Sequence, residues 1–322
     1  MKKIATLTSG GDAPGMNAAV RAIIRGSAHF GLEVTAVRHG YKGLINGAFT
    51  DLKHTDVSGI IQRGGTILKS ARSDEFRTKE GRKKAADQLR EQGVDALIVI
   101  GGDGTFRGAT LLSKEHGINT IGVPATIDND LIGTDETIGY DSALNIAMEA
   151  IDKIRDTADA HERLFFIEVM GRDAGFIALE TGIASGAEMI VLPEYLTSIP
   201  EIKESLNKVL KVHKRSSLVV IAEGDQTGGA VKISRELEED FQEYDMKVAI
   251  LGHVQRGGNP SARDRVLASR LGFEAVQAVY QGKSEVMVGI INNSVTFTPL
   301  KDTFGKIKEI NHDLVALAKI LR

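Results

Sequence analysis

Short β-branched runs alternate with longer amphipathic stretches along the chain, and this alternation constrains the fold more than any other feature. Strands are predicted at 3–8, 33–38, 95–100, 119–123, 163–169, 188–192, 217–223, 247–251 and 286–291. Several of these runs are apolar throughout, which is typical of parallel strands covered by helices on both faces. Helices are predicted at 15–30, 78–92, 105–116, 139–160, 174–185, 200–213, 231–242 and 261–281. The pattern therefore predicts an α/β protein with a doubly wound, parallel sheet.

Composition narrows the classes to which the chain can belong. Its 322 residues fit one large domain or two closely joined domains. The net charge of -3 gives no general attraction for nucleic acid, and no apolar run reaches the length of about 18 residues that a membrane span needs. The absence of cysteine excludes disulfides and thiol chemistry and fits a reducing compartment, so a cytoplasmic location is expected.

Glycine-rich segments follow several predicted strands, at the edge where open parallel sheets bind their ligands. In the first, SGGDAPGMNAAVRAIIR at 9–25, Gly10 and Gly15 have the spacing of a phosphate loop. Met16 and Asn17 stand where that motif has lysine and a hydroxyl residue. Backbone N–H groups and a helix N-terminus can still hold a phosphate. A plain glycine turn is the alternative, but the spacing favours phosphate binding.

The second glycine-rich segment, ALIVIGGDGTFRGA at 96–109, runs from a buried strand into a helix. Its glycines narrowly miss the dinucleotide-binding spacing, and no acidic residue ends a second strand at the required distance. Asp103 stands between glycines, a position that suits a carboxylate holding Mg²⁺ beside phosphates. An ordinary Asx turn is the alternative interpretation. The motif GGDGT also occurs in kinases with sugar, lipid or nucleotide acceptors.

The third segment, PATIDND at 124–130, places two carboxylates just beyond another predicted strand. Thr126, Asp128 and Asp130 alternate, so they would face one way in an extended segment. One carboxylate could take a proton from a hydroxyl while the other serves a metal. Read alone, a polar turn is an equally good interpretation.

A series of motifs in fixed order carries a family resemblance. The motifs are TSGGDAPGMNAAVR, QRGGTILKSAR, EFR, VIGGDGT, TIDNDLIGTDETIGYDSA, DKIRDTADAH, EVMGRDAGF, VLPE, AEG and LGHVQRGGNPSARDRVLASRLG. In this order they resemble the bacterial ATP-dependent 6-phosphofructokinase family over essentially the whole chain. The resemblance implies two interwoven doubly wound Rossmann-like domains with mostly parallel central sheets. It assigns ATP to residues 1–138 plus 251–300, and fructose 6-phosphate to 139–250 plus 301–322.

The resemblance also implies which residues bind ATP and Mg²⁺. Arg72 is expected to supply the positive charge on the ATP phosphates that the first glycine-rich loop lacks. Asp103 and Asp130 are the implied magnesium carboxylates. The implied ATP-binding set is Gly11, Arg72, Gly102, Asp103, Gly104 and Thr105.

The implied reaction is the glycolytic phosphorylation of fructose 6-phosphate by ATP. Asp128 is implied as the base at the sugar 1-hydroxyl, with Thr126 at the transferred phosphate and Arg172 as a further catalytic residue. The implied sugar-phosphate set is Thr126, Asp128, Arg163, Met170, Gly171, Arg172, Glu223, Lys247, His253 and Arg256. Because the family's Arg163 contact crosses between subunits, the resemblance implies a homotetramer with shared sites.

Several active-site positions depart from the family pattern. Lys247 replaces a usual arginine, so a point charge takes the place of a bidentate fork and weaker sugar-phosphate affinity is expected. Ala125 stands where ATP users have glycine and pyrophosphate users have lysine, while Gly104 matches the ATP users. These two positions favour ATP. Ser73 replaces a usual aromatic residue near the adenine, which would loosen base selectivity.

The effector site of the family is only partly matched. The resemblance places ADP and phosphoenolpyruvate at Arg21, Arg25, Arg155, Glu188, Lys214 and Arg215. His54, Gly59 and Ser216 replace an arginine, an aspartate and a histidine of the family. Gly59 removes the carboxylate expected to hold the effector's Mg²⁺, so weak or absent regulation is expected.

Three other functions compete with this interpretation. The first is a pyrophosphate-dependent phosphofructokinase. The second is a lipid or NAD kinase of the GGDGT type, which leaves the MGR, GHVQRGG and PATIDND motifs unexplained. The third is a nucleotide sensor without catalysis, against which the intact Asp103 and Asp128 count.

Overall fold

The structure is a computed structural model that describes residues 2–160, 163–212 and 217–321. The chain forms two compact units, Met1–Ser142 with Arg256–Lys308 and Ala143–Gln255 with Glu309–Arg322, which we call the first and the second unit. The chain therefore passes between the units three times, after Ser142, after Gln255 and after Lys308. The predicted domain limits, and the assignment of one substrate to each domain, stay predictions.

The first unit is built on a seven-stranded sheet in the order β11-β10-β5-β4-β1-β2-β3. Its strands are β1 (Lys3–Thr8), β2 (Glu33–Val37), β3 (Phe49–Asp51), β4 (Ala96–Gly101), β5 (Asn119–Pro124), β10 (Val286–Ile291) and β11 (Ser294–Pro299). The pairs β2–β3 and β10–β11 are antiparallel, and the remaining neighbours are parallel. Strand β1 lies between β2 and β4, so the direction of winding reverses at β1 and β4 and creates a topological switch point there.

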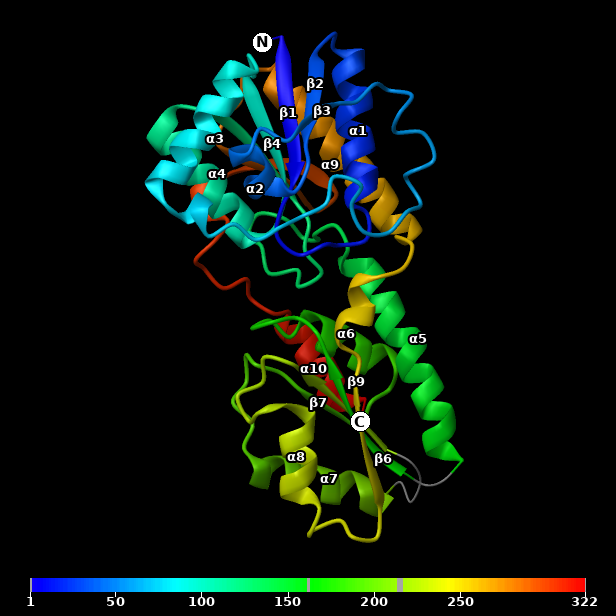
Figure 1. Cartoon of the computed structure of the whole chain (residues 1–322). Helices are drawn as coiled ribbons and strands as arrows, with labels where there is room; N and C mark the ends of the chain where they lie inside the picture. The colour runs from blue at the N-terminus through cyan, green and yellow to red at the C-terminus, as the bar shows by residue number, and fades with distance from the viewer. Residues whose placement is uncertain (1, 161–162, 213–216, 322) are drawn as a thin grey trace. The chain divides into compact units, whose positions relative to one another are not determined.

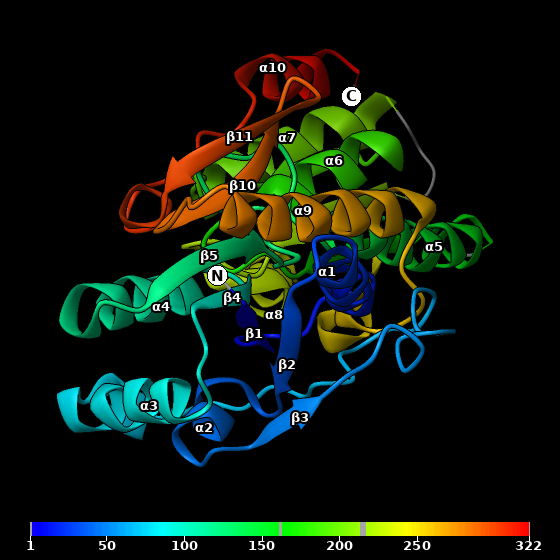
Figure 2. The ribbon, with the colours of Figure 1, turned by 90° about the horizontal axis from the view of Figure 1, so that it is seen from above.

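Helices cover both faces of this sheet (Figures 1 and 2). Its helices are α1 (Met16–His29), α2 (Gly40–Ile45), α3 (Lys79–Glu91), α4 (Asp103–His116) and α9 (Ala262–Tyr280), with 3₁₀ turns η1 (Glu75–Arg77) and η3 (Leu300–Asp302). Helices α1 and α9 pack together on one face. On the other face, Leu89 of α3 and Phe106 of α4 join strand residues such as Val99 in one buried cluster. Burial of the strands on both faces explains their unbroken apolar runs.

The second unit has a four-stranded, all-parallel sheet in the order β7-β8-β6-β9. Its strands are β6 (Arg163–Val169), β7 (Met189–Val191), β8 (Ser217–Ala222) and β9 (Asp245–Ile250). Its helices are α5 (Tyr140–Asp159, whose first residues belong to the first unit), α6 (Phe176–Ala184), α7 (Ile199–Val212), α8 (Gly229–Leu237) and α10 (His312–Ile320), and η2 (Gly252–Arg256) follows β9. Residues of α7 and α8 bury Phe166 and Val219 of the sheet. Strand β9 is an edge strand and leaves Val248 and Ile250 exposed.

The predicted fold class is confirmed, because both sheets are mostly parallel and alternate with helices. All the predicted strands and helices are found. The predictions missed the short β3, β11, α2 and α10. They also extended the helix at 231–242 too far, since α8 begins at Gly229 and ends at Leu237. Asn292 and Asn293, with φ of 49° and 62°, form the tight turn between β10 and β11, a sequence signal that could have revealed the hairpin.

Candidate active site

Three loops meet at the carboxyl ends of the adjacent strands β1, β4 and β5. They are the two glycine-rich segments and PATIDND, in the same order as their strands. Ser9 N donates to Ile100 O at 2.9 Å, and Ala125 N donates to Gly101 O at 3.0 Å, so the loops leave the sheet side by side. This edge includes the switch point, where ligands of doubly wound sheets bind.

The first loop connects the end of β1 to α1, so the N-terminus of α1 lies at this edge of the sheet. Gly10 and Gly15 have φ of 84° and 109°, conformations that side chains with a Cβ rarely adopt. Gly15 is the N-cap of α1 and brings no side chain to cap it, which leaves backbone N–H groups for an anion. Asn17 does not take the role of a phosphate-loop hydroxyl. Its side chain donates to Arg63 O and accepts from Ile67 N, so it anchors the segment that leads to Arg72.

The second loop carries Asp103 into the first turn of α4. Within the described residues, Asp103 Oδ1 and Thr105 Oγ1 are buried without a hydrogen-bond partner, and Arg107 Nη2 lies 3.5 Å from Asp103 Oδ1. The space beside Gly104 is open, since a Cβ there would meet no atom within 4 Å. Tyr41, whose pKa is raised by burial, donates its hydroxyl to Thr105 O at 2.6 Å and supports the turn from behind.

The third loop holds Asp128, which is 3 % exposed. Its backbone N–H donates to Thr126 Oγ1 at 3.2 Å, which makes the two predicted catalytic side chains neighbours. Asn129 adopts a left-handed conformation with φ of 52° between the two aspartates. Its amide donates to Asp135 O and accepts from Thr137 N. Asn129 therefore ties the loop to the segment at Asp135 and Thr137, which follows it in the chain.

Two cations approach this third loop. Arg256 Nη2 lies 3.8 Å from Asp128 Oδ1. Its Nη1 donates to Asp12 O at 3.3 Å, and a Cβ on Gly11 would lie 2.8 Å from that same nitrogen. Arg256 thus joins the first loop to the third. Lys308 Nζ donates to Asn129 Oδ1 at 3.0 Å, a contact that sequence reasoning missed.

Predicted sugar-phosphate residues gather at the carboxyl edge of the second sheet. Met170, Gly171 and Arg172 follow β6, and Glu223 follows β8, its neighbour in the sheet. Glu223 Oε1 accepts from the backbone N–H groups of Gly171 and Arg172 at 3.3 and 2.9 Å. Arg172 has φ of 52°, a strained conformation for a non-glycine residue that clusters at functional sites. His253 is exposed in η2, directly after β9.

Arg163 and Lys247 lie away from this group, at the amino-terminal end of the sheet. Arg163 is the first residue of β6 and Lys247 the third of β9. Both bind Asp245, at 2.8 and 2.6 Å, and these hydrogen bonds hold the pKa of Asp245 below its ordinary value. The seven residues of β6 span about 20 Å, so Arg163 is separated from Met170 within one chain by roughly that length.

The predicted effector residues are divided between the two units. On α1, burial and then Arg25 lower the pKa of Arg21, and Arg25 Nη2 lies 3.5 Å from Ser58 Oγ. In the second unit, Arg155 donates to Ser185 O at 2.7 Å and lies 3.9 Å from Glu188, which accepts from Leu218 N. Lys214 and Arg215 lie outside the described residues.

Arg72, another predicted position, is exposed and follows the residues that Asn17 anchors. Gly102 lies beside the side chain of Thr126. Asp130 is partly buried. Ala125 is 1 % exposed. No helix among the described residues is long and apolar enough to cross a membrane.

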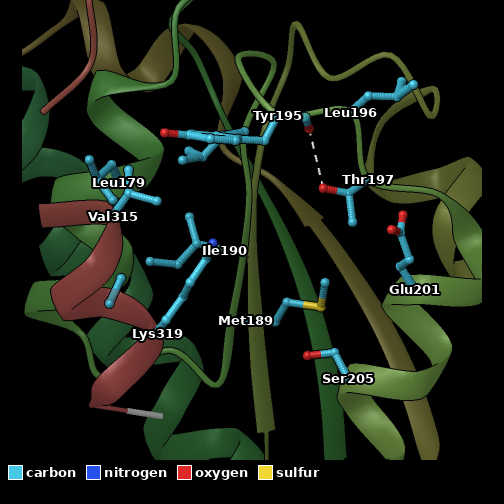
Figure 3. Close-up of a pocket in the computed structure, with 12 residues that line it drawn as sticks. Leu179, Met189, Ile190, Tyr195, Leu196, Thr197, Glu201, Ser205, Val315 and Lys319 are labelled. Atoms are coloured by element: carbon cyan, nitrogen blue, oxygen red, sulfur yellow. Dashed lines mark hydrogen bonds between the residues drawn. The ribbon is translucent and has the colours of Figure 1, made fainter. Parts of the chain in front are cut away.

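A separate cavity of about 240 Å³ lies in the second unit between α6, α7, β7 and α10 (Figure 3). Its wall is mixed, with apolar side chains such as Met189 and Val315 beside polar ones such as Glu201 and Lys319. Glu201 in the wall accepts from Ser198 N and Oγ, which caps α7. None of the predicted site residues lines this cavity.

The sheets and loops define a doubly wound α/β protein with glycine-rich loops at the carboxyl edge of one sheet. A family model described as phosphofructokinase matches residues 3–279. The ATP-dependent 6-phosphofructokinase of Cytophaga hutchinsonii is 54% identical over 321 residues, covering 100% of this chain and 98% of the relative. The ATP-dependent 6-phosphofructokinase 1 of Thermus thermophilus is also 54% identical, over 100% of this chain and 99% of the relative.

Solved structures agree with these sequence matches. The phosphofructokinase of Saccharomyces cerevisiae has a TM-score of 0.86 at 40% identity and covers 99% of this chain, which spans 46% of the yeast chain. A pyrophosphate-dependent enzyme of Marinobacter aquaeolei has a TM-score of 0.85 at 24% identity, over 97% of this chain and 86% of that one, and it supports the fold alone.

The chain belongs to the phosphofructokinase family. The resemblance to its bacterial ATP-dependent 6-phosphofructokinases is confirmed over the full length of the chain, and with it the enzyme class predicted from the motifs.

Proposed function

We propose that this protein transfers the γ-phosphoryl group of ATP to the 1-hydroxyl of fructose 6-phosphate, giving fructose 1,6-bisphosphate and ADP. The observation that carries the proposal is the meeting of two glycine-rich loops and a buried aspartate at three adjacent strand ends. Phosphoryl transfer needs mainly positioning and neutralisation of charge, and this edge offers both.

In this proposal, Asp128 accepts the proton of the 1-hydroxyl as that oxygen attacks the γ-phosphorus. Arg256, whose guanidinium lies 3.8 Å from the carboxylate, forms an ion pair with Asp128 and would orient it towards the substrate. Thr126, whose hydroxyl accepts from Asp128 N, is close enough to contact the transferred phosphoryl group. Gly11 and the α1 N-terminus, with Arg72, bind the remaining ATP phosphates.

Residues at this edge also fit Mg²⁺. Asp103 Oδ1 is buried and accepts no hydrogen bond among the described residues, and its one ion pair, with Arg107 at 3.5 Å, shows that this oxygen lies where a cation is favourable. Mg²⁺ usually takes only one or two carboxylates, with phosphates and water as its other ligands. Asp103 and Asp130 would therefore hold it. When bound, the ion supplies positive charge to the β- and γ-phosphates.

The sugar phosphate would bind Met170, Gly171, Arg172, Glu223 and His253 of one chain. Arg163 and Lys247 would come from a neighbouring chain of a homotetramer, because they lie at the opposite end of their own sheet. Lys247 presents a point charge, so we propose that it holds the phosphate less firmly than an arginine fork would.

A steady-state assay with fructose 6-phosphate tests the function directly. Turnover is expected with ATP and not with pyrophosphate, because the buried Ala125 brings no ammonium into the space where pyrophosphate users carry lysine. Removing Mg²⁺ with EDTA is the control and should abolish the ATP reaction. Turnover with pyrophosphate alone would overturn the choice of phosphoryl donor, and no turnover with either would overturn the proposed function.

Regulation by phosphoenolpyruvate and ADP is expected to be weak. Gly59 has φ of 69° and no carboxylate to hold an effector's Mg²⁺. We expect phosphoenolpyruvate to change KM for fructose 6-phosphate by less than about twofold, against the roughly 5- to 150-fold typical of allosteric coupling. Saturation curves with and without each effector measure this. Strong sigmoidal inhibition that ADP relieves would contradict the expectation.

A further inference from the structure

Asp264 is a fully buried carboxylate in the first turn of α9 that the mechanism above does not use. It accepts three hydrogen bonds from the beginning of α5. Gly139 N donates to Oδ1 at 2.7 Å, and Ser142 donates to Oδ2 through N at 2.8 Å and through Oγ at 2.6 Å. Two of the three partners are backbone N–H groups, which only donate, and an ionised carboxylate can accept from all three.

The starts of the two helices are joined by hydrogen bonds at this point. Ser261, the N-cap of α9, accepts from Asp264 N and donates its hydroxyl to Asp141 of α5. Ser261 N in turn donates to Ser142 Oγ at 2.9 Å. Asp264 of α9 therefore caps the start of α5, while Asp141 and Ser142 of α5 bind Ser261, the N-cap of α9. The positive ends of both helix dipoles favour the two carboxylates.

The segments just before both helices contact the loop that carries Asp128, the proposed base. Just before Gly139, Ile138 N donates to Pro124 O at 3.0 Å, and Thr137 Oγ1 donates to Thr126 O at 2.6 Å. These bonds hold the loop of Asp128 against the segment that Asp264 binds. On the other side, α9 follows the segment that begins with Arg256, the ion-pair partner of Asp128.

Asp264 also borders the first glycine-rich loop. A Cβ on Gly15 would lie 3.6 Å from Asp264 Cβ and 2.7 Å from Ile138 Cγ2. One buried side chain thus lies against the segments that carry the phosphate loop, the base and the arginine.

We infer that Asp264 is a positioning residue for phosphoryl transfer, which sets the spacing between Asp128 and Arg256 by bracing the starts of α5 and α9. The inference rests on the proposed function, since it gives Asp264 a role through the proposed base. Burial raises the pKa of Asp264 to about 6, so near neutral pH the side chain is the carboxylate that its three donors require.

Asp264→Asn is the test variant, because it keeps the size of the side chain but turns an NH₂ group towards a donor. We expect kcat to fall by about 10- to 100-fold, the scale of a small misplacement of reacting groups, with KM for ATP unchanged. A double-mutant cycle with Asp128→Ser, measured on kcat, separates a positioning role from a general loss of structural stability. If Asp264 acts through Asp128, Asp264→Asn should cause little further loss once Asp128 is gone.

Two further variants keep the test decisive. Glu201→Gln is the matched control, since Glu201 also accepts from a serine at a helix start, away from the site, and its kcat should be that of the wild type. If Asp264→Asn does not fold, Ser142→Ala leaves the carboxylate in place and removes one of its donors together with the acceptor of Ser261 N, so it should give a smaller loss with the same dependence on Asp128. An equal loss in both Asp128 backgrounds, or a change in KM alone, overturns the inference. Full activity of Asp128→Ser itself would instead overturn the proposed base.

Discussion

Replacing Asp128 by serine is expected to lower kcat by about 10²- to 10⁴-fold, the usual contribution of a positioned general base. KM for ATP should stay nearly constant, because the proposed ATP contacts come from the loops after β1 and β4. The carboxylate is buried and ion-paired with Arg256, so solvent water is poorly placed to replace it. Steady-state kinetics over a range of both substrates gives the two constants separately.

Glu149→Gln is a suitable control for this experiment, because it neutralises an exposed carboxylate on α5 that pairs with the exposed Lys153 on the same helix. It should leave both constants unchanged. An Asp128→Ser enzyme that kept most of its kcat would show that another group takes the proton. A wild type that binds ATP but never turns over would instead favour the nucleotide sensor.

Mixing two inactive variants is expected to restore activity. Asp128→Ser lacks the proposed base, and Arg163→Ala lacks the cation proposed to reach the sugar phosphate of a neighbouring chain. After dissociation and reassociation of an equal mixture, about a quarter of randomly formed shared sites would carry both wild-type residues. Assays at low fructose 6-phosphate should therefore show about a quarter of the wild-type rate.

The reason for this expectation is the length of β6. Arg163 begins the strand and Met170 follows its end, about 20 Å further on, so the two cannot hold the same phosphate within one chain. The same variants mixed without dissociation provide the control and should stay inactive. If reassociated mixtures were no more active than the average of the separate variants, each site would have to be complete within a single chain.

Sequence reasoning located the three loops because their strands have a clear apolar pattern and parallel strands present their carboxyl ends at one edge. Asp103, Asp128 and Thr126 could be predicted to lie near each other on that basis. The order of the strands, and hence the adjacency of β1, β4 and β5, follows from packing between distant segments and is not written in any local pattern.

Contacts between residues far apart in the sequence could not be predicted from local patterns either. Arg256 was predicted to bind substrate, whereas its pairing with Asp128 depends on how α9 and its leading segment return to the sheet. Asp264 lies within the predicted helix at 261–281, where nothing in the periodicity distinguishes a buried carboxylate from a solvated one. The hairpin turn at Asn292 and Asn293 is different, since its residues carry a recognisable local preference.

The chain passes between its units after Ser142, before Arg256 and after Lys308. Arg256 and Lys308 contact Asp128 and Asn129 directly, and Ser142 donates to Asp264, the positioning residue inferred above. An insertion at any of these three crossings is therefore expected to shift the position of Asp128, the proposed base. Natural insertions, and tags or linkers added by engineering, should therefore be poorly tolerated there. Turns such as that at Gly31, beside which a Cβ would meet no atom within 4 Å, are where we expect this chain to accept added residues without loss of activity.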